Sequence, residues 1–224
     1  LNNQINQGKN IKFDTIRYCE IDSLKDYSYD WIIGCYVETS TGFKHLISSI
    51  KEIARKCDAK LFLDATASIG LEENHDLADL LAFSSCKGLF GLTGACFITF
   101  NDLPIQPINS FYLDIRTHLE KKTTGPYHQI CSLEFILENY NFYKKAVINT
   151  KENFMKRFSK LTIFSRENQP LLCTFVNKEV YSKNKNVVLY SSRGNSLGSI
   201  VCHLGEVHLG TNASGNINQL IDII

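Results

Sequence analysis

The stretch from residue 30 to residue 65 most constrains the fold of this chain. Residues 30–38 (DWIIGCYVE) form a nearly continuous apolar run, which is typical of a β-strand buried on both faces. Residues 43–57 repeat apolar side chains at three and four positions, which predicts an amphipathic helix, and residues 60–65 (KLFLDA) predict another buried strand. A strand, a helix and a strand joined by short connections indicate an α/β fold with a mostly parallel sheet flanked by helices.

The remaining segments predict two parts. Those before residue 162 favour strands at 11–21, 80–85 and 95–100, an irregular stretch at 101–127, and helices at 129–140 and 145–161. Those after it favour short strands within 171–178, 186–192 and 199–205 and a terminal helix at 216–224. We therefore expect a large domain over 1–145 and a small C-terminal α+β lobe over 146–224.

Charge and cysteine content exclude several kinds of partner. The chain has 24 Lys and Arg against 23 Asp and Glu, without a basic stripe, so a nucleic-acid partner is not expected. No apolar run approaches the roughly 18 residues of a membrane span, and a signal peptide is not expected from the polar first residues. The eight cysteines form no C-x-x-C pair and the six histidines are scattered, which favours reduced thiols in a cytoplasmic protein without a metal site.

Polar segments follow three of the predicted strands: ETSTG (38–42), DATAS (64–68) and SSCKG (84–88). In open α/β sheets ligands bind beyond the carboxyl ends of the strands, so a small-molecule site is expected there. Taken singly, each residue has a plainer explanation. Asp64 could cap a turn instead of pairing with a cationic ligand atom, and Lys87 could be an exposed loop lysine instead of a reactive amine.

Taken in order, the strings VETSTG (37–42), LDATASIG (63–70) and SSCKGLFGLTGACFI (84–98) resemble the class V aminotransferases of fold type I, which use pyridoxal 5'-phosphate (PLP). They are most similar to 2-aminoethylphosphonate–pyruvate aminotransferases, with alanine–glyoxylate aminotransferases as related enzymes. The resemblance covers about residues 11–150. It implies that residues 1–145 are a partial PLP-binding large domain.

The resemblance implies roles for six residues. Lys87 would form the Schiff base with PLP and then move the proton, and Asp64 would hold the proton on the ring nitrogen. The other cofactor contacts would come from Thr66 against one ring face, Thr39 near the ring hydroxyl, Ser85 at the phosphate and Thr124 at the phosphate of a neighbouring subunit's cofactor. The Thr124 contact implies a homodimer with shared sites, acting on a small amine and a keto acid.

Three features depart from the family's pattern. The family's glycine/serine-rich phosphate loop is not in the sequence, which opens at Leu1. We therefore expect this sequence to be a piece of a longer protein. Cys86 stands where an asparagine or glutamine usually precedes the lysine. The arginine of the family's R-I-G string, which grips the substrate carboxylate, is replaced by His203 or His208, unless Arg193 substitutes for it.

Several readings therefore stay open. Either histidine could instead have a structural role. The chain could catalyse another class V reaction, such as that of an alanine–glyoxylate aminotransferase, a lyase or a desulfurase. It could also be a truncated or non-catalytic fragment of such an enzyme.

Overall fold

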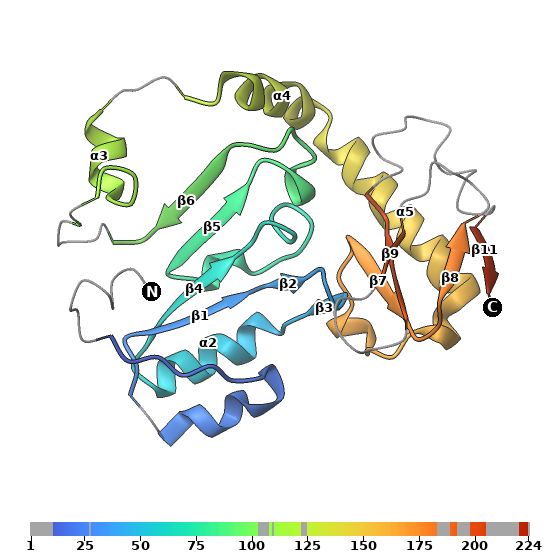
Figure 1. The fold of residues 1–224 in the computed structure, drawn as a ribbon, viewed down its shortest axis with the longest axis horizontal. Coiled ribbons are helices and arrows are strands. Elements are labelled where there is room, and N and C mark those ends of the chain that lie inside the picture. The colour runs from blue at the N-terminus through green and yellow to red at the C-terminus, as the bar shows by residue number, and fades with distance from the viewer. Residues whose placement is uncertain are drawn as a thin grey trace.

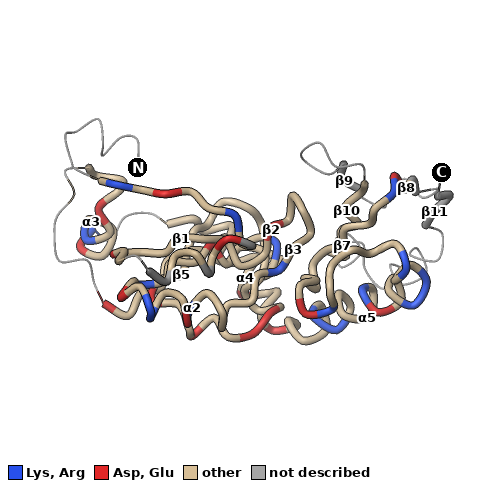
Figure 2. The backbone as a smooth tube through the Cα atoms, turned by 90° about the horizontal axis from the view of Figure 1, so that it is seen from below, with Lys and Arg blue, Asp and Glu red and all other residues tan. Residues whose placement is uncertain are grey.

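The computed structural model of the chain describes residues 11–26, 28–102, 108, 110–121, 125–182, 189–191, 198–204 and 220–223. Figure 1 shows two groups of strands, with the central sheet on one side and the small lobe on the other, joined by the long helix α5 (Tyr140–Phe158). Seen from below, charged residues of both signs are interspersed along the chain (Figure 2).

The central sheet has the order β1-β4-β5-β6. Its strands are β1 (Trp31–Cys35), β4 (Lys60–Asp64), β5 (Leu80–Ser84) and β6 (Cys96–Phe100). β1, β4 and β5 run parallel, and β6 is antiparallel to β5. The predicted α/β class and the mostly parallel sheet are thus confirmed.

Helix α2 (Ile47–Lys56) covers one face of this sheet because its apolar side chains recur at helical spacing. Ile47, Ile50 and Ala54 are buried in the same cluster as Leu61 and Leu63 of β4. The helix is shorter than the predicted 43–57. Its first residues instead form β3 (Phe43–Lys44), which pairs with β2 (Val37–Glu38).

The expectation that strand 30–38 is buried on both faces is wrong. Trp31 is 42% exposed and Ile33 61% exposed, whereas Ile32 packs against the core. Because side chains alternate along a strand, Ile32 faces α2 and its two neighbours face the other way. Cys35 and Asp64 are paired across β1 and β4, so they lie on the same outward face as Ile33.

In the described residues of the small lobe, short strands form two antiparallel sheets. One sheet has the order β7-β10-β9, formed by β7 (Cys173–Val176), β10 (Ser199–Cys202) and β9 (Leu189–Ser191). The other pairs β8 (Val180–Ser182) with β11 (Leu220–Ile223). The expected boundary between residues 145 and 146 falls inside α5, which is one continuous helix.

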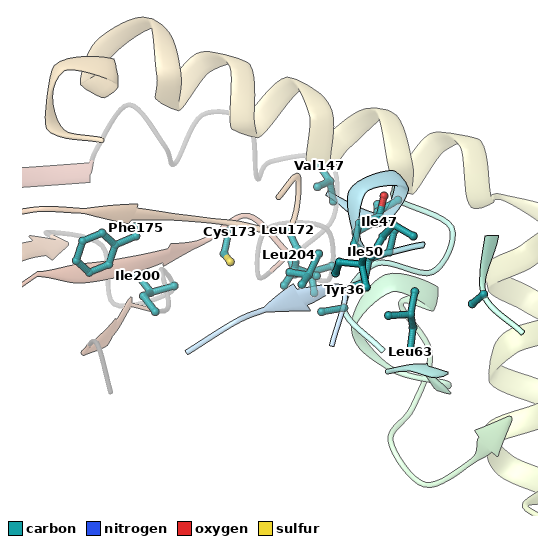
Figure 3. Close-up of a cluster of buried hydrophobic side chains, with 14 of the residues drawn as sticks. Tyr36, Ile47, Ile50, Leu63, Val147, Leu172, Cys173, Phe175, Ile200 and Leu204 are labelled. Carbon is teal, nitrogen blue, oxygen red and sulfur yellow. The ribbon is translucent and has the colours of Figure 1, made fainter. Parts of the chain in front are cut away.

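One apolar cluster runs through both parts of the molecule (Figure 3). Val147 of α5 and Leu172 are buried together with Tyr36, Ile47 and Leu63 from the central sheet and its helix. Burial of a large apolar side chain contributes roughly 1.5–3 kcal/mol, so this cluster stabilises the arrangement of the two parts.

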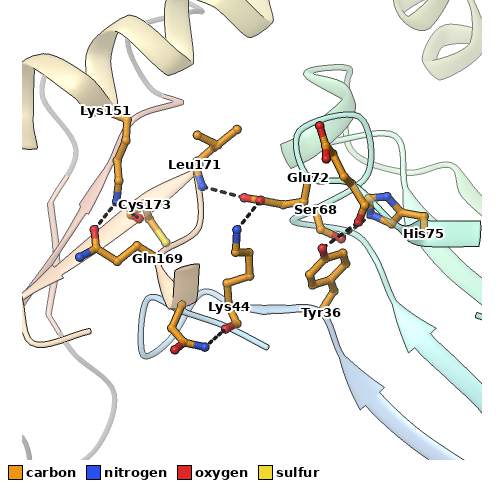
Figure 4. Close-up of polar contacts among 11 residues, drawn as sticks. Tyr36, Lys44, Ser68, Glu72, His75, Lys151, Gln169, Leu171 and Cys173 are labelled. Atoms are coloured by element: carbon orange, nitrogen blue, oxygen red, sulfur yellow. Dashed lines mark hydrogen bonds and ion pairs between the residues drawn. The ribbon is translucent and has the colours of Figure 1, made fainter. Parts of the chain in front are cut away.

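A network of polar contacts lies beside this cluster (Figure 4). The Glu72 carboxylate forms an ion pair with Lys44 at 2.9 Å and accepts a hydrogen bond from the Leu171 amide at 2.8 Å. The Asn168 side chain donates to the Lys44 carbonyl oxygen. Lys44 and Glu72 therefore fix the segment that enters β7.

Three further predicted elements differ in the structure. Residues 11–17 have no regular structure and Tyr18–Asp26 form a 3-10 helix, so the strand expected at 11–21 is wrong. Residues 220–223 form β11 rather than part of a terminal helix, because their pairing with β8 supplies backbone hydrogen bonds. The stretch 101–127 contains the short helix α3 (Ile115–Glu120), whose first turn is capped by the Asp114 carboxylate.

The two helices expected at 129–140 and 145–161 are confirmed as α4 (Tyr127–Glu138) and α5. None of the helices in the described part of the chain has the length and apolar character needed to cross a membrane.

Candidate functional site

The three polar segments predicted from the sequence meet at one edge of the central sheet. β1, β4 and β5 are parallel, so their carboxyl ends lie at the same edge. Each segment begins with the last residue of a strand: 38–42 at the end of β2, just beyond β1, 64–68 at the end of β4, and 84–88 at the end of β5. This edge brings together Thr39, Asp64 and Lys87.

Asp64 is the last residue of β4 and its side chain is exposed. One carboxylate oxygen, Oδ1, accepts a hydrogen bond from the Thr66 amide at 2.8 Å. This bond fixes the carboxylate against its own loop, as in an Asx turn. The side chain therefore presents an oriented anion at the strand end.

Lys87 lies at the start of the short 3-10 helix η3 (Lys87–Leu89), and its side chain is exposed. Its backbone has a φ of 47°, which is uncommon for a residue other than glycine. The Nζ atom lies 3.2 Å from Oγ1 of Thr39 and donates to it. The amine thus reaches from the end of β5 across to the loop that follows β2.

Thr66 connects these two charged residues. Its amide donates to Asp64, and its carbonyl oxygen accepts a hydrogen bond from the Gly88 amide at 3.2 Å. Two successive hydrogen bonds therefore tie the Asp64 carboxylate to the residue that follows Lys87. This arrangement fixes the relative position of an acid and an amine.

Ser85 is fully buried and closes the loop between β5 and β6. Its hydroxyl donates to the Leu92 carbonyl oxygen at 2.5 Å, lies 3.4 Å from that of Ala95, and accepts from the Ala95 amide at 3.2 Å. In this arrangement the hydroxyl is engaged by the protein's own backbone.

Cys35 and Glu38 also line the site, and sequence reasoning gave them no role. Burial, together with the negative charges of Glu38 and Asp64, raises the pKa of the Cys35 thiol to about 12, and the charge of Lys87 opposes this rise. The thiol thus lies within the electrostatic reach of all three charged groups. Glu38 stands inside the ETSTG string, which was the available signal; Cys35 carried none.

The Glu38 carboxylate stays ionised beside the lysine. Burial pushes its pKa upward, but hydrogen bonds from the hydroxyl and amide of Ser40 outweigh burial and lower the pKa below its usual range. The Cys35 thiol and the charge of Lys87 act in the same direction. Glu38 therefore adds a second anion near the Lys87 amine.

The structure buries the side chain of His203 inside the protein. Its side chain is 1% exposed, its Nε2 lies 2.9 Å from Oγ1 of Thr174, and its ring packs on Phe154. These contacts favour the structural role for His203. Thr124, Arg193 and His208 lie outside the described residues.

A cavity of about 900 Å³ lies between the loop after β4, α5 and the segment before β7. Tyr36, Lys44, Glu72, Lys151 and Gln169 are among its lining residues, and none of the described site residues borders it. Tyr36 packs in the α2-side core, whereas Asp64 lies on the opposite face of the sheet, so the cavity is separate from the site.

Comparisons with known proteins show the fold. No protein-family model matches the chain, and no curated protein matches its sequence. An alanine–glyoxylate aminotransferase from Nostoc sp. has a similar structure, with a TM-score of 0.69 and 16% identity over 91% of this chain and 62% of that one.

Two further solved structures are similar. A pyridoxamine–pyruvate aminotransferase from Mesorhizobium loti gives a TM-score of 0.65 and 18% identity over 91% of this chain and 64% of that one. A cysteine desulfurase from Thermococcus onnurineus gives 0.57 and 15% identity, with 94% and 66% covered. The chain thus has the fold of these enzymes and spans somewhat less than two thirds of their length.

Proposed function

We propose that the chain carries the lysine half of a PLP-dependent aminotransferase site. The observation that supports it is the placement of Lys87 and Asp64 at neighbouring strand ends, tied together through Thr66. A PLP site needs a primary amine for attachment and a carboxylate for the protonated ring nitrogen. Both groups are present, both are exposed, and they lie on one edge of the sheet, so these residues fit the cofactor.

Each residue has a defined task in this proposal. Lys87 attaches the cofactor and moves a proton to and from the carbon that bears the substrate's amino group. Asp64 keeps the ring nitrogen protonated, and PLP when bound supplies the electron sink. Thr39 accepts a hydrogen bond from the lysine amine and would stand near the ring hydroxyl, and Thr66 would lie against one ring face.

Two hydroxyl groups would contact the cofactor phosphate in this proposal. Ser85 donates to the cofactor phosphate only if its hydroxyl gives up its bond to the Leu92 carbonyl oxygen. Thr124, from a second subunit, serves the same phosphate. The homodimer that this requires is supported by exposed apolar side chains on and next to α4, among them Tyr127, Phe135 and Phe142.

The proposed reaction is of the 2-aminoethylphosphonate–pyruvate type, in which an amino group passes from an aminophosphonate to a keto acid in phosphonate metabolism. Its support is the order and spacing of the ETSTG, DATAS and SSCKG strings. The burial of His203 removes one residue that could replace the family's carboxylate-binding arginine, so another residue would have to bind the carboxylate of the keto acid. Within the described residues, seven of the eight cysteines are not joined in disulfides, which supports a cytoplasmic location.

The experiment that tests the cofactor site is a spectrum with added PLP, followed by borohydride reduction and peptide mapping. Lys87 should carry the reduced adduct, and Lys87→Ala should abolish both the colour and the adduct. Lys60→Ala is the matched control, because Lys60 is exposed at the opposite end of β4. An adduct that survives in Lys87→Ala would contradict the proposal.

The reaction type is tested with the same protein. Activity with 2-aminoethylphosphonate and pyruvate should exceed activity with alanine and glyoxylate. Sulfide release from cysteine would instead favour the desulfurase alternative, whose fold the chain shares. An adduct without turnover of any donor would favour the fragment alternative.

A further inference from the structure

We propose that Tyr140, the first residue of α5, is a positioning residue that sets where the Lys87 amine stands. The expected effect on PLP affinity rests on the proposed function. The expected effect on the position of the Lys87 amine does not depend on it. The juxtaposition that carries it is a single phenol hydroxyl lodged between the loop after β4 and the turn after β5.

The lysine turn adopts a backbone that needs external support. Lys87 and Phe90 have φ values of 47° and 60°, in the left-handed region that side-chain-bearing residues avoid. Such a conformation costs on the order of 1 kcal/mol per residue and persists only when surrounding contacts enforce it. The contacts around Gly88 provide this enforcement.

Gly88 is held from two sides. Its amide donates to the Thr66 carbonyl oxygen at 3.2 Å, and its carbonyl oxygen accepts a hydrogen bond from the Tyr140 hydroxyl at 2.9 Å. A Cβ at this position would overlap the Ile69 carbonyl oxygen, so the turn sits directly against the neighbouring loop. The two peptide groups on either side of the Gly88 Cα are therefore both held, one by Thr66 and the other by Tyr140.

The same hydroxyl also touches the loop that follows Asp64. A Cβ on Gly70, which has a φ of 75°, would overlap the Tyr140 hydroxyl oxygen. The ring packs against Phe90, and burial raises the pKa of Tyr140 to about 12, so the phenol remains a donor at neutral pH. Tyr140 thus spaces the Asp64 loop and the Lys87 turn at once.

The consequence is that Tyr140→Phe should release the turn while keeping the ring. The Lys87 amine would no longer be held against Thr39 and would react faster with acetic anhydride. We expect the labelling of Lys87 relative to exposed Lys60 to rise about 3- to 10-fold, the range of one lost hydrogen bond. The apparent affinity for PLP should fall by a similar factor.

Two further variants make the experiment decisive. Tyr143→Phe is the matched control, because Tyr143 packs on the same Phe90 ring from the next turn of α5, and it should label like the unaltered protein. Gly70→Ala should raise Lys87 labelling by displacing the hydroxyl. It should add little more in a Tyr140→Phe background, because both changes act through the same group.

The outcomes are read by mass spectrometry of the cofactor-free protein. Buried Lys151 serves as an internal reference for the fold. Increased labelling of Lys87 while Lys151 stays protected supports the positioning role. Equal labelling of Lys87 in Tyr140→Phe and Tyr143→Phe overturns it. Increased labelling of both Lys87 and Lys151 also overturns it. If unaltered protein forms no PLP adduct at Lys87, the proposed function fails and the labelling result still decides the role of Tyr140.

Discussion

The carbonyl oxygen of Thr66 accepts a hydrogen bond from the amide of Gly88 at 3.2 Å, and this bond joins the loop after β4 to the turn after β5. It places an exposed carboxylate and an exposed amine on a common support. Support from the backbone matters because neither charged side chain is fixed by burial. Functional groups held this way keep their geometry while remaining open to a ligand.

Asp64→Asn tests the carboxylate. The amide side chain keeps an oxygen that can accept from the Thr66 amide, but it removes the negative charge that would hold the ring proton. We expect the rate with saturating PLP to fall roughly 10- to 100-fold, as for the loss of a charge-assisted hydrogen bond. Steady-state kinetics measure this, with Asp102→Asn, an exposed residue just after β6, as the control.

Ser85→Ala separates two roles of one hydroxyl. The change leaves the Leu92 carbonyl oxygen and the Ala95 amide without their partner in a buried loop. The free energy of unfolding should fall by about 1–3 kcal/mol in urea titrations. Ser49→Ala, on the exposed side of α2, should change it by less than about 0.5 kcal/mol.

The opposite result would be equally informative. If Ser85→Ala unfolds like the unaltered protein but binds PLP more weakly, the hydroxyl serves the phosphate rather than the loop.

Much of the central sheet could be predicted because its signals are local. β1, β4, β5, β6 and α2 each show their apolar period within a few residues, and the site strings follow directly from the strand ends. β11 could not be predicted, because a short apolar segment becomes a strand only through pairing with the distant β8. The prediction that β1 is buried on both faces was wrong, because the sequence of a strand does not show whether other elements cover each of its faces.

The same distinction applies to the site. Lys87, Asp64 and Thr39 were predicted from the order of three strings, and the structure brings them to one edge. The bond between Tyr140 and Gly88 spans 52 residues and has no local signal. The orientations of Ser85 and His203 depend on tertiary packing, so their sequence neighbours could not reveal that both are buried.

His203 should make the protein sensitive to acid. Burial lowers the pKa of His203 well below its usual value of 6.5. The unfolded chain therefore takes up a proton below about pH 6.5 that the folded protein refuses, and stability is lost as the pH falls. Relative to His203→Gln, the unaltered protein should lose up to about 1.4 kcal/mol per pH unit below 6.5.

Urea titrations at pH 7.0, 6.0 and 5.0 measure this slope. His128→Gln, at an exposed position on α4, should keep the slope of the unaltered protein. Parallel slopes for the unaltered protein and His203→Gln would show that the buried ring does not carry the acid sensitivity.

Lys151 should make the stability of the protein depend on pH in the alkaline range as well. The Nζ atom donates to Oε1 of Gln169 at 3.0 Å, to Oγ1 of Thr174 at 2.5 Å and to the Cys173 carbonyl oxygen at 3.3 Å. Burial nevertheless lowers the pKa of Lys151 from 10.5 to about 8. Between these two values the unfolded chain binds more protons than the folded one, so stability attributable to this residue rises with pH.

Lys151→Met removes both the bonds and the titration. At pH 7 the loss of the three bonds should lower the free energy of unfolding by about 1–3 kcal/mol, since buried acceptors lose their donor. From pH 8 to 10 the unaltered protein should gain up to about 1.4 kcal/mol per pH unit relative to the variant. Lys145 is exposed on the same helix, so Lys145→Met is the control and should show neither effect. If the stability difference between Lys151→Met and the unaltered protein stayed constant from pH 8 to 10, the buried amine would be keeping its proton.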